Sequence, residues 1–115
     1  MPRPRSPQSP HSRYREAQKL TVLPLEHDLP APELPNGRDW SAAEKEQWAA
    51  LWRTSQSYVW DDSTISAVAA LVVYWSAILA GTASSTQHME YRHLLRALGL
   101  TPEGMRALGW VIADE

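Results

Sequence analysis

The sequence predicts an all-α fold, a small bundle of about four helices behind a disordered, proline-rich and basic N-terminal arm. The composition changes at about residue 36, because eight of the nine prolines lie in residues 1–36. A segment so rich in proline lacks backbone donors and buries little apolar surface. In residues 37–115, capping signals followed by apolar residues at helical spacing recur instead. We therefore divide the chain into an arm and linker, residues 1–36, and a helical oligomerisation domain, residues 37–115.

The first helix is expected to begin after Ser41. Ser41 and Glu44 have the spacing of a capping box, in which the two residues satisfy each other's backbone amides. Apolar residues follow three and four positions apart, and the helix is expected to end near Thr54. We assign three tryptophans to the core, two from this helix and one from the next: Trp48, Trp52 and Trp75.

The second helix is expected from Thr64 to a stop at Gly81, after the capping side chains of Asp61-Asp62-Ser63. No residue from 64 to 83 is charged. Large side chains occupy one arc of this helix and small ones the opposite arc, so the large arc suits a core and the small arc permits close approach of another helix. We predict that the small arc forms a subunit interface through Ala67, Ala70, Tyr74 and Ala77.

Two more helices are expected in the C-terminal part of the chain. Ser84 and Gln87 have capping-box spacing for a helix from Ser85 to Leu98, with Gly99 placed to end it. Thr101-Pro102-Glu103 then supplies an N-cap, a proline at the first helical position and an acid in the first turn. Apolar residues continue the helical spacing of this fourth helix as far as residue 112: Met105, Leu108 and Ile112.

The charge of the chain is unevenly distributed. Residues 1–19 hold five basic side chains and one acidic one, a balance of +4, whereas the whole chain carries −2. A basic tail on a mildly acidic body often contacts nucleic acid, although it can also aid solubility or dock on its own acidic body. The third helix adds a basic strip that begins at His88, for which a solvated helix face is the alternative. The predicted DNA-binding residues are Arg3, Arg5, Arg13, Arg15, Lys19, Arg92 and Arg96.

The sequence contains none of the catalytic motifs that would indicate an enzyme. It has no phosphate-binding G-x-x-x-x-G-K-[ST] loop and no G-x-S-x-G turn, and the absence of cysteine removes thiolate ligands and disulfides. Asp61-Asp62 could bind a metal ion, but helix capping explains the pair more simply. We therefore expect no enzymatic activity, no cofactor and no metal site.

The uncharged segment 64–83 is long enough for a transmembrane helix. Its serine and threonine residues, the lack of lysine or arginine beside either end and the amphipathic segments around it favour a helix buried in a soluble protein. No secretory signal is visible at the N-terminus. We expect a cytoplasmic protein without membrane contact, and a small membrane protein is an alternative.

Several short motifs occur in an order that resembles a known family. They are the turn Leu34-Pro35-Asn36-Gly37-Arg38-Asp39-Trp40, the helix end Trp52-Arg53-Thr54, and Leu98-Gly99-Leu100-Thr101-Pro102 followed by Trp110. With this order and spacing, residues 30–112 resemble terminase small subunits of tailed phages that infect actinobacteria. Relatives often carry several arginines after the LGLTP motif, whereas this chain has only Arg106 there.

The resemblance implies a non-catalytic subunit that forms a ring in the host bacterial cytoplasm. Such a subunit binds phage double-stranded DNA near the packaging start, hands it to the large terminase subunit and modulates the ATPase and nuclease of that subunit. With the basic arm, this leads us to expect weak, salt-sensitive phosphate contacts that a ring-like homo-oligomer multiplies. A protein–protein adaptor without DNA binding is the principal alternative.

Overall fold

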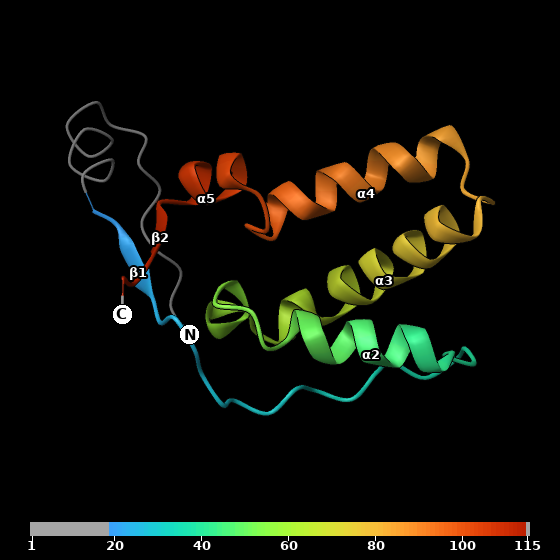
Figure 1. The fold of residues 1–115 in the computed structure, drawn as a ribbon, viewed down its shortest axis with the longest axis horizontal. Helices are drawn as coiled ribbons and strands as arrows, with labels where there is room; N and C mark the ends of the chain where they lie inside the picture. The colour runs from blue at the N-terminus through green and yellow to red at the C-terminus, as the bar shows by residue number, and fades with distance from the viewer. Residues whose placement is uncertain (1–18, 115) are drawn as a thin grey trace.

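The fold consists of stacked helices with a short two-stranded sheet at one end (Figure 1). The computed structural model describes residues 19–114. Helix α3 lies between α2 and α4 and packs against both, and α5 with the sheet lies at the end of α4 that is far from the α3–α4 turn (Figure 1). The elements are β1 (Thr21–Leu23), α2 (Ala42–Leu51), the 3-10 turns η1 (Gln56–Val59) and η2 (Asp62–Thr64), α3 (Ile65–Ala80), α4 (Ser85–Ala97), α5 (Pro102–Leu108) and β2 (Trp110–Ile112).

The helix starts that the sequence predicts are confirmed at α2 and α4. Ser41 Oγ accepts from the Glu44 amide at 3.1 Å, and the Ser41 amide donates to the Glu44 carboxylate at 2.9 Å. The same reciprocal pair joins Ser84 and Gln87 at the start of α4. Each capping box satisfies two amides that would otherwise lack partners at the helix end.

The fourth helix is shorter than predicted, and this corrects the expectation of an all-α fold. Helix α5 ends at Leu108 because Gly109 adopts a left-handed conformation, with φ of 74°. Residues 110–112 then form β2, which pairs in parallel with β1 in the register Thr21↔Trp110 and Leu23↔Ile112. The apolar residues after Gly109 therefore belong to a strand, although their spacing also fits a helix.

Residues 24–35, which the sequence assigned to an extended linker, pack along the helical body, and we call them the strap. The strap has no helix or strand, but side chains of the body donate hydrogen bonds to its carbonyls. Trp48 Nε1 donates to Pro32 at 2.8 Å and Trp40 Nε1 donates to Pro35 at 3.0 Å. Ser55 Oγ donates to the Leu25 carbonyl at 3.0 Å. The packed body therefore begins before residue 36.

His27 fixes the strap to the turn that contains η1. Its Nδ1 accepts from the Leu29 amide at 3.1 Å, so in the neutral ring Nε2 carries the proton and donates to the Thr54 carbonyl at 2.9 Å. The same Nε2 lies 2.8 Å from Ser57 Oγ. These bonds join residues about 30 positions apart, so they are features of the fold and not of local sequence.

The core lies between α2, α3 and the start of the α4–α5 turn. The predicted core positions Trp48 and Trp52 are buried there, and Trp60 packs against Trp52 with ring centroids 5.1 Å apart. Trp75 was also predicted to be a core residue, but it is only half-buried and lies outside the buried cluster. The other buried apolar members of the cluster are Leu51, Val68, Ala69, Leu71, Val72 and Leu98.

Candidate nucleic-acid interface

Arg92 and Arg96 lie one turn apart on the exposed face of α4. Residues four positions apart on a helix point in the same direction, so both guanidinium groups can address one surface. They line a shallow hollow of about 290 Å³ together with Thr101 and Glu103. The structure thus brings together the two arginines of this helix that the sequence singled out.

Helix α5 adjoins α4 and carries a third exposed arginine. An added Cβ on Gly104 would lie 2.3 Å from the Arg96 carbonyl oxygen, so α5 rests directly on the end of α4 and only glycine fits at this position. Arg106 lies three residues after Glu103 on α5 and is exposed. Sequence reasoning left Arg106 out of the predicted DNA-binding residues, because it is the single arginine in the helix after the LGLTP motif. We call the exposed arginines of these two adjoining helices, Arg92, Arg96 and Arg106, the basic face.

One acidic side chain lies within the basic face. Glu103 Oε2 is 3.8 Å from the Arg96 guanidinium, and the two side chains are 67% and 56% exposed. Exposed pairs of this kind typically contribute only about 0–1 kcal/mol, because water and salt screen them. Arg96 can therefore exchange this carboxylate for a phosphate at little cost.

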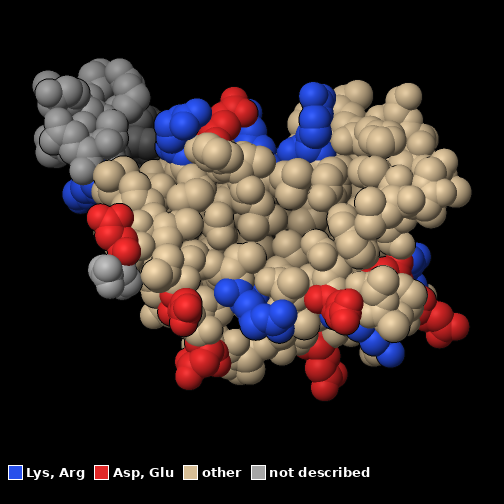
Figure 2. All heavy atoms as spheres, viewed as in Figure 1, with Lys and Arg blue, Asp and Glu red and all other residues tan. Residues whose placement is uncertain are grey.

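The distribution of charge separates this face from the rest of the body. Blue side chains gather over α4 and α5 in Figure 2, with a red one between them. Residues 85–109 hold three arginines and two glutamates, whereas residues 19–84 hold four basic and eight acidic side chains. A polyanion is therefore attracted to the α4–α5 face more than to the remainder of the described surface.

The β1–β2 pairing places the root of the basic arm beside α5. The Thr21 amide donates to the Gly109 carbonyl at 2.8 Å, and the Lys19 carbonyl oxygen would lie 3.6 Å from a Cβ on Gly109. Lys19 is itself exposed. The other predicted arm contacts lie outside the described residues: Arg3, Arg5, Arg13 and Arg15.

Asp61 acts as a cap in the structure. Its Oδ1 accepts from the Ser63 amide at 2.9 Å and from Ser63 Oγ at 2.6 Å, at the start of η2. These two bonds to the charged form hold the pKa of the Asp61 carboxyl below its usual range. Among residues 19–114, no group of three or more histidine, aspartate or glutamate side chains is arranged to hold a metal ion.

The predicted interface residues of α3 are all partly exposed. Ala67 packs against the chain's own core cluster, whereas Ala70, Tyr74 and Ala77 do not belong to it. The two arcs of α3 were each expected to pack against another helix. Within one chain, both α2 and α4 pack against α3. The four residues keep some exposed surface, and the predicted interface stays a prediction.

An exposed apolar surface lies at the α3–α4 end of the molecule. The sequence has no lysine, arginine, aspartate or glutamate between Asp62 and Glu90. Leu79 is 69% exposed and Met89 is 45% exposed. Next to them is an open hollow lined in part by Ile78 and Tyr91. Figure 2 shows the upper part of this end in tan, with charged side chains lower on the same side of the view. We call these four residues the apolar tip.

One helical segment of the described chain, Asp62–Ala80, is long and apolar enough to cross a membrane by length and composition. Val68 and Val72, in its centre, are fully buried among the other helices. A core helix passes the same test of length and composition.

Comparisons with protein-family models, with curated proteins and with solved structures give no match for this chain.

Proposed function

We propose that this protein is a non-enzymatic, arm-bearing DNA-binding subunit. The observation that carries the proposal is the position of the arm root. The β1–β2 pairing holds Thr21 at Gly109, at the end of α5, next to the basic face. Arg15 lies four residues before Lys19, so at about 3.5 Å per residue it reaches at most about 14 Å from this root. The arm and the basic face can therefore contact the same duplex.

Within that class we propose a terminase small subunit that recognises phage double-stranded DNA in the host cytoplasm and loads the large terminase subunit. The sequence resemblance over residues 30–112 is the support for this particular role. The charge pattern supports DNA binding more generally, because arginines on an exposed helix face contact phosphates without requiring a base sequence. The separation of the basic face from the acidic remainder gives the bound DNA a defined side of the protein.

We also propose that the subunit forms a homo-oligomer. A single arm with four or five basic residues binds weakly at physiological salt, and several arms on one assembly raise the effective concentration of contacts. The apolar tip supports this proposal, because its exposed leucine and methionine offer apolar surface that a second copy could cover, with Arg92 at the edge of the same hollow.

The experiment that tests the function is a DNA titration followed by fluorescence anisotropy at two salt concentrations. The full chain is compared with Arg92→Ala/Arg96→Ala and with the control Arg53→Ala, which removes an exposed arginine outside the basic face. We expect the double variant to weaken binding and to reduce its salt dependence by up to about two phosphate contacts. Arg53→Ala should leave both unchanged. A wild-type chain that does not bind DNA at low salt would contradict the proposal and favour the adaptor function.

A further inference from the structure

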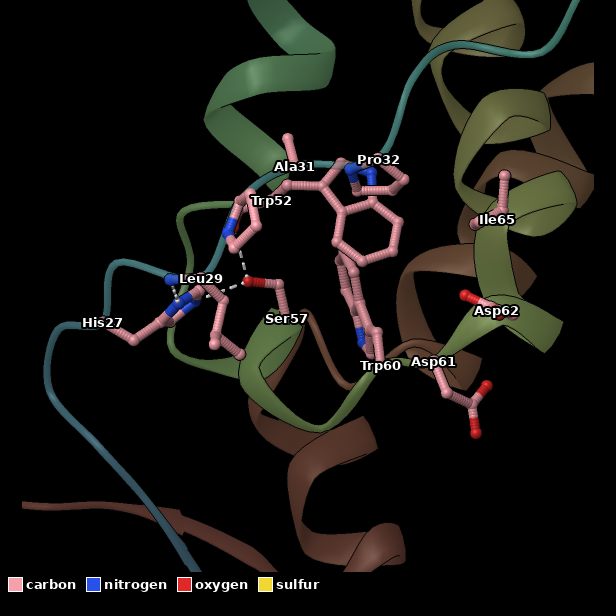
Figure 3. A pocket seen from close by; sticks show the side chains of 11 residues that line it. His27, Leu29, Ala31, Pro32, Trp52, Ser57, Trp60, Asp61, Asp62 and Ile65 are labelled. Atoms are coloured by element: carbon pink, nitrogen blue, oxygen red, sulfur yellow. Dashed lines mark hydrogen bonds between the residues drawn. The ribbon is translucent and has the colours of Figure 1, made fainter. Parts of the chain in front are cut away.

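A cavity of about 260 Å³ lies between the strap and the start of α3 (Figure 3). Trp52 and Trp60 form an aromatic wall, and the strap covers the opposite side. Both tryptophans are at least nine-tenths buried, whereas Leu29 at the mouth is 50% exposed. The remaining lining residues are His27, Pro30, Ala31, Pro32, Ser57, Asp61, Asp62 and Ile65.

The rim of this cavity is acidic. Asp61 and Asp62 are lining residues, and both are exposed. No lysine or arginine is among the lining residues. A cation next to an aromatic wall gains attraction from the ring face and from nearby carboxylates, so the cavity suits a basic side chain on an apolar backbone.

The strap shows how tryptophan side chains of this protein bind a proline-rich segment. Trp48 and Trp40 each donate an indole N–H to a proline carbonyl of the strap. Trp52, in the wall of the cavity, carries a buried indole N–H for which residues 19–114 provide no acceptor. A buried donor without a partner costs roughly 1–3 kcal/mol. The nitrogen is closed off from solvent, so the ring face of Trp52, and not its N–H, is the part that a ligand in the cavity meets.

We propose that this cavity binds the start of the chain's own basic arm, the segment Pro2-Arg3-Pro4-Arg5. Alternating proline favours a polyproline II helix, which aromatic-lined grooves recognise with little loss of entropy. The two arginines match the two carboxylates of Asp61 and Asp62 at the rim. Arg5 lies 14 positions before Lys19, a separation of up to roughly 43 Å at 3.1 Å per residue in a polyproline II helix. That length exceeds the distance to the cavity, because His27 in its wall lies eight residues after Lys19 and so at most about 28 Å from it at 3.5 Å per residue.

The arm can dock in the cavity whether or not the protein binds DNA. If the protein binds DNA, arm docking would regulate that binding. Arg3 and Arg5 cannot hold the cavity rim and a phosphate at the same time, so only the undocked fraction of arms is ready for DNA. The apparent dissociation constant rises by the reciprocal of that fraction, so an arm docked half of the time weakens its DNA contacts by about twofold. Asp62→Lys should recover this factor at low salt.

The test uses the full chain with a nitroxide spin label at Ser6→Cys, a unique position because the chain has no cysteine. The label broadens the indole N–H signals of nearby tryptophans in an NMR spectrum. We expect stronger broadening of the Trp52 and Trp60 signals than of the Trp75 signal. Trp75 lies ten residues beyond Ile65, about 15 Å along α3, and serves as the internal reference.

Charge reversal then tests the chemistry of the contact. Arg3→Glu/Arg5→Glu should remove the selective broadening, and adding Asp62→Lys to that variant should restore it. Adding Glu46→Lys, which places the same charge on exposed α2, should not restore it. Equal broadening of all three tryptophans in the wild-type chain, or broadening that survives the arginine reversal, would overturn the proposal. DNA is absent throughout, so failure here leaves the DNA-binding function untouched.

Discussion

Replacing Leu23 by alanine tests whether β1 belongs to the folded body. Leu23 is fully buried in a segment that composition assigns to a disordered arm, and its carbonyl accepts from the Ala113 amide at 2.8 Å. Truncating a buried leucine removes transfer free energy and leaves a cavity, at a cost of about 2–5 kcal/mol. Since β1 lies at the edge of the molecule, where neighbours can relax into the space, we expect about 3 kcal/mol.

Val22 supplies a matched control in the same strand. It is 62% exposed and points to the opposite face, so Val22→Ala should change the free energy of unfolding by less than about 0.5 kcal/mol. Urea denaturation followed by tryptophan fluorescence measures both variants. For a domain of this size, 3 kcal/mol also corresponds to a fall in Tm of roughly 12–24 °C. If Leu23→Ala is as stable as Val22→Ala, the strand does not contribute to the fold and the arm is not rooted beside α5.

Three further changes test other parts of the structure. The hydrogen bond from the Ser41 amide is the largest cause that lowers the pKa of buried Glu44. The ionised carboxylate therefore stabilises the fold fully above the unfolded pKa of Glu44, and this stabilisation is lost as the pH falls through the lower folded pKa. Glu44→Gln should make Tm less sensitive to pH below about 4.5. Gly104→Ala should cost about 1–3 kcal/mol in urea denaturation, because the new Cβ would clash with the Arg96 carbonyl. Leu79→Glu should lower the mass of the proposed homo-oligomer, measured by light scattering.

The Leu79→Glu variant needs a control that adds the same surface charge at another position. Leu20 is 56% exposed and lies away from the apolar tip, at the root of β1, so Leu20→Glu adds the same charge elsewhere. We expect this variant to keep the mass of the wild-type assembly. Equal loss of mass in both variants would show that added charge, and not the apolar tip, controls association.

Local signals in the sequence predict the helix starts well. The capping boxes at Ser41 and Ser84 and the stop at Gly81 lie within a few residues of the amides and carbonyls that they satisfy, so no tertiary information is needed to read them. The pairing of Arg92 with Arg96 on one exposed face follows in the same way from their spacing of four residues.

The features that sequence reasoning missed depend on contacts between distant residues. Strand β2 exists because β1, about 90 positions away, offers it a partner, and the apolar residues after Gly109 fit a helix equally well when taken alone. The strap is held by tryptophan donors on α2 and before it, whose bonds to proline carbonyls leave no local pattern. Trp75 follows the apolar stripe of α3 but lies beyond the part of that helix that the core covers.

The salt dependence of DNA binding tests the central claim most directly. We would measure the dissociation constant of the full chain for duplex DNA between 50 and 300 mM salt, beside a variant with Arg3, Arg5, Arg13 and Arg15 changed to alanine. Each lost phosphate contact reduces the slope of log K against log salt by about 0.9, so the arm variant should lose up to about 3.6 per subunit. It should keep a smaller slope from the α4–α5 face. Identical slopes for the two proteins would contradict a DNA-binding arm.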